Sequence, residues 1–258
     1  YSLFMLALAR KELSACSFRL FIGEKPLLPQ TIEDLSTEVT EDELNEAFID
    51  EWGVKYSKDG RKLLKAPQGL KGNYSVKVGT RIICDDAFSK CSFLTSIVIS
   101  NSVVSIGDGA FKFSSLSNIV IPDSMTSIGS GAFWGCCSLS NVVVPDSVTS
   151  IGNGAFGSCS SLSNIGIPSC VTNIANFLFC GCRTLSDIVI PDSVTSIGIG
   201  AFSNCRFLSN IVIPDSVTNI RRGAFYKCNL PYRLEQNLIS HFGNELFKFP
   251  LQIPGYKR

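Results

Sequence analysis

Cysteine is the residue type whose number and spacing most strongly suggest chemistry, since 11 cysteines occur in 258 residues. Six of them recur three residues after a repeated phenylalanine: Cys91, Cys136, Cys159, Cys182, Cys205 and Cys228. Thiolates in one column could bind a metal or exchange electrons. However, no Cys-x-x-Cys pair is present, and a stack of thiols lacks the converging tetrahedral geometry of a zinc site. We therefore expect these cysteines to be buried, reduced and free of metal.

A column of aspartates suggests a second kind of chemistry, cation binding. Asp123, Asp146, Asp192 and Asp215 share one phase of the repeat, which Ser169 interrupts. Stacked carboxylates could bind Ca²⁺. The glycine-rich signature of calcium-binding β-solenoids is absent, however, and Pro-Asp is ordinary turn chemistry. The sequence therefore predicts no metal ion and no cofactor.

Catalysis is not indicated by any grouping of residues. His241 is the one histidine, and no nucleophile elbow or phosphate-binding glycine loop is present. The net charge is +1, so no basic field points to a nucleic acid. No apolar run is long enough to cross a bilayer. We predict that the chain is not an enzyme, does not bind nucleic acid and has no transmembrane segment, while its oligomeric state stays open.

The elements that position these residues belong to a repeat. Phenylalanines recur every 23 residues, with one interval of 22: Phe88, Phe111, Phe133, Phe156, Phe179, Phe202 and Phe225. In the unit 208–225, Ile211 and Ile213 lie two residues apart, as the inward face of a strand requires, and Pro214 ends that strand. The period lies within the roughly 20–29 residues of a leucine-rich repeat. The sequence therefore predicts a repeat solenoid of this type, mainly β, with parallel strands stacked once per coil.

One string carries a more specific resemblance. It reads I-x-I-P-D-S-V-T-S-I-G-x-G-A-F-x-x-C-x-x-L and is plainest at residues 144–162 and 190–208. This string resembles the BspA-like leucine-rich repeat of bacteria and some protists, over about residues 74–230. The resemblance implies a curved or twisted solenoid, often displayed on a cell surface and involved in adhesion. Two units depart from the string: the Ile174 unit reads Ala-Asn-Phe-Leu-Phe for Gly-x-Gly-Ala-Phe, and the Phe111 unit has lost its cysteine.

The two ends differ from the repeat and suggest caps. Residues 40–73 combine a capping box, Thr40-x-x-Glu43, a short amphipathic helix carrying Leu44, Phe48 and Trp52, and a hairpin around Asp59-Gly60. Residues 230–258 begin with Pro231, suited to the first turn of a helix. That helix would carry an apolar stripe of Leu234, Leu238 and Phe242 and end at Gly243. We predict an N-terminal cap at 40–73, a solenoid of about seven coils at 74–229 and a helical cap at 230–258.

Residues 1–39 are expected to be a leader of unclear role. The segment 1–9 is apolar like part of a signal peptide, and Leu13-Ser-Ala-Cys16 fits a bacterial lipobox. Charged residues at positions 10–12 interrupt both patterns.

The outward side of the strands offers the candidate contact surface. We expect strands at 97–99, 119–121, 142–144, 165–167, 188–190 and 211–213, all in one sheet. Their outward side chains form two nearly uniform columns, one polar and one mostly valine. The candidate contact residues are Asn118, Val120, Asn141, Val143, Asn164, Asp187, Val189, Asn210 and Val212. Contiguous exposed apolar surface often marks an interaction site.

We therefore predict a non-catalytic binding or adhesion module that contacts a protein or a surface glycan. The alternative is a structural or self-associating spacer without a distinct ligand, which near-identical repeats would suit. The resemblance suggests a cell-surface or secreted protein, whereas unpaired thiols suggest the cytoplasm. Divergent residues in the turns could add specificity: Lys112, Phe113, Trp134, Arg183, Arg206, Phe207, Tyr226 and Lys227.

Overall fold

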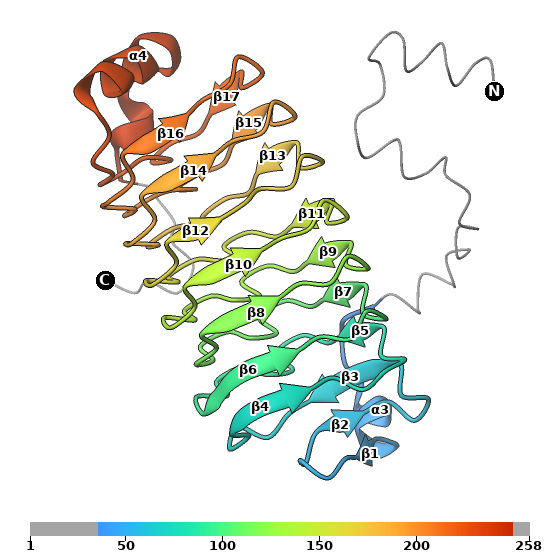
Figure 1. The fold of residues 1–258 in the computed structure, drawn as a ribbon. Coiled ribbons are helices and arrows are strands. Elements are labelled where there is room, and N and C mark those ends of the chain that lie inside the picture. The colour runs from blue at the N-terminus through green and yellow to red at the C-terminus, as the bar shows by residue number, and fades with distance from the viewer. Residues whose placement is uncertain (1–35, 250–258) are drawn as a thin grey trace, which may run out of the picture.

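Residues 36–249, which the computed structural model describes, form a solenoid of stacked coils. Figure 1 shows two rows of strands along the molecule, with α3 and β1 at one end and α4 at the other. The predicted fold class, a mainly β solenoid with few helices, is confirmed. Most of the predicted leader 1–39, and residues 250–258 of the predicted C-terminal cap, lie outside the described residues.

The long strands of the coils form one row and the short strands the other. The long-strand row contains β4, β6, β8, β10, β12, β14 and β16, and the short-strand row contains β3 and the odd-numbered strands from β5 to β17. The bounds of all elements are α3 Glu41–Asn45, β1 Phe48–Ile49, β2 Lys55–Tyr56, β3 Lys62–Lys65, β4 Gly72–Ser75, β5 Ile82–Ile83, β6 Leu94–Val98, β7 Ser105–Ile106, β8 Asn118–Val120, β9 Ser127–Ile128, β10 Asn141–Val143, β11 Ser150–Ile151, β12 Asn164–Ile165, β13 Asn173–Ile174, β14 Asp187–Val189, β15 Ser196–Ile197, β16 Asn210–Val212, β17 Asn219–Ile220, α4 Tyr232–Phe242 and the 3₁₀ helix η2 Asn244–Phe247.

The core is built around one phenylalanine per coil. All seven repeat phenylalanines have at most 1% of their surface exposed. Neighbouring rings stack with centroids 5.1–6.1 Å apart and planes within 20° of each other. The widest spacing is 6.1 Å, between Phe156 and Phe179. The repeat phase therefore becomes a continuous aromatic column, which isolated coils could not bury.

A Gly-x-Gly step precedes four of the seven repeat phenylalanines and lets neighbouring coils approach closely. A Cβ atom on the first glycine would lie 2.4 Å from a backbone nitrogen at Gly152 and 2.7 Å from one at Gly198. The second glycine has a positive φ, +63° at Gly154 and +60° at Gly200, which side chains rarely adopt. The turns that contain these glycines stack on one another by backbone hydrogen bonds, and we call this stack the turn wall.

The strands do not form one sheet, and that prediction is wrong. Strands β4, β6, β8, β10 and β12 share a sheet, but β14 and β16 form another. The short-strand row is interrupted at the same level, because β11 ends one sheet and β13 begins the next. Five of the six strands also begin one residue earlier than predicted, at the exposed polar residue, and β6 begins at the buried Leu94.

The coil between the two sheets differs from its neighbours at several positions, and three of them lie on the outward face of its strand or in the Gly-x-Gly step. Ala175 replaces the first glycine, Phe177 takes the left-handed position of the second with φ +57°, and Gly166 replaces the outward valine. In other coils the backbone N–H at the first-glycine position donates to a carbonyl of the preceding coil, as Gly198 does to Ile174 at 2.8 Å. Within the described residues, the N–H of Ala175 makes no such bond. Arg221 keeps its bond, at 2.9 Å, so a side chain there does not break the ladder by itself. We attribute the break to the three changes together.

The turn wall crosses this break intact. The N–H of Gly154 donates to Asn176 at 2.8 Å, and that of Ser158 donates to Cys180 at 2.6 Å. The hydroxyl of Thr184 also reaches across, donating to the carbonyl of Leu162 at 3.0 Å. The solenoid therefore stays continuous on one side where both rows of strands are interrupted.

The N-terminal end contains the predicted capping box and hairpin, but its helix is shorter than predicted. Thr40 and Glu43 cap the helix reciprocally, and α3 ends at Asn45. Phe48 lies in strand β1 and stacks on Tyr56 at 5.3 Å, while Trp52 is 53% exposed. The predicted apolar helix face is therefore wrong, since strand pairing of Phe48 opposite Tyr56 competes with it.

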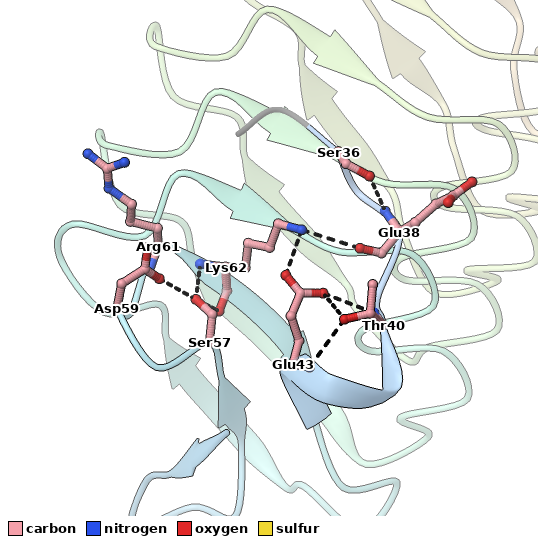
Figure 2. A network of polar contacts seen from close by, with 8 residues as sticks. All are labelled: Ser36, Glu38, Thr40, Glu43, Ser57, Asp59, Arg61 and Lys62. Atoms are coloured by element: carbon pink, nitrogen blue, oxygen red, sulfur yellow. Dashed lines mark hydrogen bonds and ion pairs between the residues drawn. The ribbon is translucent and has the colours of Figure 1, made fainter. Parts of the chain in front are cut away.

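Figure 2 shows the polar network that ties α3 to β3. The ammonium of Lys62 lies 2.8 Å from Oε1 of Glu43, and both side chains are largely buried. Partial burial acts to raise the pKa of the Glu43 carboxyl, but hydrogen bonds from Lys62 and Thr40 outweigh it, so the pKa lies below its usual value. This pair therefore fixes α3 on β3, the strand at the start of the short-strand row.

The C-terminal end uses two elements, of which the sequence indicated one. Helix α4 follows Pro231 and ends at Gly243, and its Leu238 is buried against the core. The 3₁₀ helix η2 continues the turn wall: the N–H of Phe225 donates to Leu246 at 2.9 Å. The ring of Phe247 lies 6.3 Å from that of Phe225. Thus η2 takes the place of a further Gly-Ala-Phe turn.

Candidate interaction surface

The outward side of the long-strand row, which we call the strand face, carries a column of exposed valines. Their exposed fractions are 60% for Val98, 76% for Val120, 74% for Val143, 79% for Val189 and 70% for Val212. The isoleucine or valine preceding each of them is at most 5% exposed. Val98, Val120 and Val143 lie in register on adjacent strands. The face therefore offers apolar side chains at the spacing of the strands, about 4.8 Å.

The polar column beside the valines is exposed as well. Asn118, Asn141, Asn164, Asp187 and Asn210 lie at the first positions of their strands. The amide of Asn210 donates to Oδ1 of Asp187 at 2.7 Å. Hydrogen bonds from Ser186 and Asn210 lower the pKa of the Asp187 carboxyl, so this residue adds a negative charge to the column.

The sheet break divides the strand face into two patches. Val98, Val120 and Val143 belong to the five-stranded sheet, whereas Val189 and Val212 belong to the two-stranded sheet. Gly166 stands between them, and a Cβ there would meet nothing within 4 Å. All nine predicted contact residues are exposed on this face, but the structure does not unite them on one sheet.

The cysteine column faces the interior and is chemically quiet. Five of the six column thiols donate a hydrogen bond to the backbone carbonyl of the phenylalanine in the preceding coil. Examples are Cys159 to Phe133 and Cys205 to Phe179, both at 3.1 Å. Burial raises the pKa of the Cys136 thiol to about 11 and that of Cys228 to about 12. Five of the six column cysteines are fully buried, as predicted, whereas Cys228 is only partly buried.

Where the repeat lacks its cysteine, a serine takes the same place. Ser114 follows Phe111 by three residues and is buried. Its hydroxyl lies 3.3 Å from the sulfur of Cys136. The position therefore selects a small hydrogen-bonding side chain that fills the interior beside a backbone carbonyl.

A second polar ladder, which sequence reasoning missed, runs along the turn wall. The carboxylate of Asp85 accepts the backbone N–H of Asp108 at 2.7 Å, and Asp108 accepts that of Ser130 at 2.6 Å. Asn176 likewise accepts the N–H of Ile199 at 2.8 Å. The variable residue of Gly-x-Gly is Asp or Asn in most of these coils, and that preference was the available signal.

The aspartates of the Pro-Asp turns do not converge on a cation site. Asp146 accepts the backbone N–H of Ser169 in the next coil at 2.9 Å and the hydroxyl of the same residue at 3.1 Å. Across residues 36–249, no three His, Cys, Asp or Glu side chains are grouped so that they could hold a metal ion. His241 lies on α4, where its Nδ1 is 2.8 Å from the carbonyl oxygen of Asn237.

Aromatic residues of the turns line another part of the surface. Phe113 is 47% and Phe207 67% exposed, and Phe93, which sequence reasoning missed, is 56% exposed. The ring of Phe113 covers Gly135, whose Cβ would lie 2.4 Å from it, and Trp134 covers Gly157 in the same way. Glycines of the next coil therefore seat these rings.

Comparison with known proteins settles the family. A family model described as a BspA type leucine rich repeat region matches residues 80–182 and 129–250, with six copies of the repeat. This chain belongs to that family. The resemblance read from the repeat string is confirmed, and the BspA-type repeats extend past the last repeat phenylalanine into the segment of α4 and η2. Such solenoids are typically non-catalytic and suggest a protein-binding repeat module.

Solved structures agree with this fold. A leucine-rich repeat protein from Bacteroides ovatus is 28% identical, with a TM-score of 0.62, over 78% of this chain and 51% of that one. One from Eubacterium ventriosum is also 28% identical, with a TM-score of 0.63, over 75% of this chain and 52% of that one. The pneumococcal vaccine antigen PcpA shares the fold at 22% identity and a TM-score of 0.53, over 78% of this chain and 47% of that one.

The BspA-type chain thus spans about half the length of these structures. No curated protein matches it. Its described helices are all too short or too polar to cross a membrane.

Proposed function

We propose that this chain is a non-catalytic module that binds a protein through the strand face. The observation that carries the proposal is the column of five valines, each at least 60% exposed on a regular β surface. Charged residues are sparse there, since Asp187 is the single charge among the nine proposed contact residues. A low-charge, apolar surface with polar neighbours is typical of the centre of a protein interface.

The energy of such a contact is spread over the face. Burying a valine side chain completely contributes about 1.5–3 kcal/mol, and each of these is already partly covered. The valines offer several equal contacts along one line, and such contacts favour an extended or multivalent partner. Adhesion to a protein or glycan on another surface would suit this arrangement, and the valines favour protein over sugar.

The location and limits of the module belong to the same proposal. The BspA-type family suggests display at a cell surface or secretion, whereas the free thiols favour the cytoplasm as the alternative. We further propose that segments 40–73 and 230–258 act as caps on the solenoid 74–229. Fractionation of cells with an antibody to the solenoid would locate the protein.

The strand face is tested with matched sets of charged substitutions. Val143→Asp alone should weaken binding to a panel of purified proteins only slightly. Val120→Asp, Val143→Asp and Val189→Asp together should abolish it. The control combines Thr149→Asp, Thr195→Asp and Thr218→Asp, which add the same charge at exposed positions away from the face. Unchanged binding by the triple valine variant would refute the proposal.

The competing function is a self-associating spacer. The near-identity of the polar and valine columns favours it, because a unique partner would diversify them. Sedimentation velocity separates the two functions. An oligomer of the native chain that the valine triple variant dissociates would support the spacer. A monomer that binds a partner would support the module.

A further inference from the structure

We propose that the groove between β16 and α4 binds an extended peptide, which adds to β16 as a further β-strand. The groove lies at the last strand of the strand face and shares Asn210 and Val212 with it, but the proposal does not depend on the function proposed for that face. The proposal concerns the edge of the sheet and not its outward surface. Three features lead to it. The edge of β16 is open, the turn wall of the same coil is covered by η2, and the groove has a second, apolar side formed by α4.

The first feature is the free edge of β16. In earlier coils the carbonyl at the serine before the strand accepts an N–H from the next coil, as Ser186 does from Ser209 at 3.1 Å. In the last coil the equivalent carbonyl is that of Ser209. β16 is the last strand of its sheet, so within residues 36–249 no later strand serves this carbonyl. Successive residues of a strand point their backbone groups to opposite sides. The N–H and C=O of Ile211 therefore point away from β14.

The second feature is the contrast with the turn wall. There η2 substitutes for a following coil, since the N–H of Gly223 donates to Glu245 at 3.0 Å and that of Phe225 donates to Leu246 at 2.9 Å. The interface between coils is thus completed on the turn side. On the long-strand side it is left open, although the ladders before it, apart from the break between β12 and β14, use the same backbone groups. A strand in the groove would continue that established interface.

The third feature is the wall opposite the edge. The groove has a volume of about 650 Å³, within the roughly 300–1,000 Å³ of ligand pockets. Residues 209–213 line one side, and Leu234, Leu238 and Phe242 of α4 line the other. An added strand would point alternate side chains toward these apolar residues and the others toward solvent. The five residues of the edge correspond to a peptide stretch of about 16 Å.

The chemistry of the groove defines its ligand. Main-chain groups of β16 select an extended backbone and no particular side chain. The apolar wall selects a large aliphatic residue at alternate positions. Asp215 and His241 are the titratable groups among the lining residues, so a peptide with little net charge fits best. The repeat strand has this pattern, and Leu-Ser-Asn-Ile-Val-Ile-Pro-Asp, the sequence of residues 208–215, is a suitable probe.

The test measures binding of that labelled peptide to the full chain by fluorescence anisotropy. Leu234→Arg places a charge in the apolar wall and should weaken binding at least about ten-fold. Gln236→Arg adds the same charge to an exposed position of α4 that does not line the groove, and should leave binding unchanged. Equal binding by both variants would overturn the proposal.

A second arm does not depend on the folding of a variant. N-methylation of the central isoleucines of the peptide removes backbone donors and keeps the side chains, so it should abolish binding. Retained binding would show that no strand is added and would overturn the proposal. Self-association of the native chain that Leu234→Arg abolishes would replace the peptide by a second copy and also overturn it. The triple valine variant of the strand face should bind the peptide normally, which keeps the two proposals distinguishable.

Discussion

Phe156 provides the most demanding test of the aromatic column. Its side chain is completely buried, and its ring stacks on Phe133 at 5.3 Å and on Phe179 at 6.1 Å. Phe156→Ala should cost about 3–5 kcal/mol for the lost transfer energy and the cavity. Two aromatic partners, each contributing about 0.5–1.5 kcal/mol beyond buried area, place the expected loss in the upper half of that range.

The measurement is urea unfolding followed by far-ultraviolet circular dichroism. With a denaturant slope of about 2.5 kcal/mol per molar, a loss of about 4 kcal/mol lowers the midpoint by about 1.6 M. Phe156→Leu, which keeps most of the volume, should lose less than about 1.5 kcal/mol. Phe247→Ala, at the partly buried end of the column, should lose less than Phe156→Ala. A loss under about 1 kcal/mol for Phe156→Ala would refute the reasoning.

Glycine, aspartate and cysteine positions supply three more tests, all read from unfolding free energies. Gly152→Ala should cost about 1–3 kcal/mol, because its Cβ would lie 2.4 Å from the backbone of the preceding coil. Gly166→Val, which has open space around its Cβ, should be neutral or stabilising. Equal effects of the two substitutions would contradict this. Asp108→Ala should cost about 0.5–1 kcal/mol by removing a 2.6 Å hydrogen bond, and exposed Asp123→Ala less than that. The pKa of the Cys136 thiol is raised from 9.0 to about 11 in the folded state, so the unfolded chain loses this proton first as the pH rises. The free energy of unfolding should therefore fall between about pH 9 and about pH 11, by about 1.4 kcal/mol per pH unit for this thiol. Cys136→Ser should make that fall less steep.

The sequence predicted what depends on the repeat phase. Residues at equal phase take equal places on successive coils, so the burial of Phe156, the exposure of Val143 and the buried thiol of Cys159 all follow from counting. The capping box at Thr40 was recognisable because its two side chains are local in sequence. The family could be read for the same reason, since the repeat string is long.

Features that depend on small differences between coils could not be predicted in this way. The break near Ala175 follows from the combined changes at Ala175, Phe177 and Gly166, and counting the repeat phase does not show what that combination does to the ladder. The role of η2 was hidden because Glu245, Leu246 and Phe247 resemble the repeat at one residue only. The open edge beside Ser209 depends on the placement of α4, which an apolar stripe does not specify.

The left-handed backbone conformation two residues after each repeat phenylalanine could not be predicted from the sequence either. It is occupied by Lys90, Phe113, Ser158, Asn204 and Lys227 as well as by glycine, all with φ between 57° and 78°. Stacking of the turn wall holds these residues in place against their own preference.

The break between β12 and β14 also bears on how the molecule comes apart. Each coil of a solenoid is coupled only to its neighbours, so cooperativity is transmitted across every junction in turn. At this junction the transmission relies on the turn wall and on the widest pair of stacked rings, 6.1 Å apart. The array therefore consists of two blocks joined by a weak link. Under force or denaturant the blocks should separate there first, so that residues before β12 and after β13 exchange their amide hydrogens at different rates.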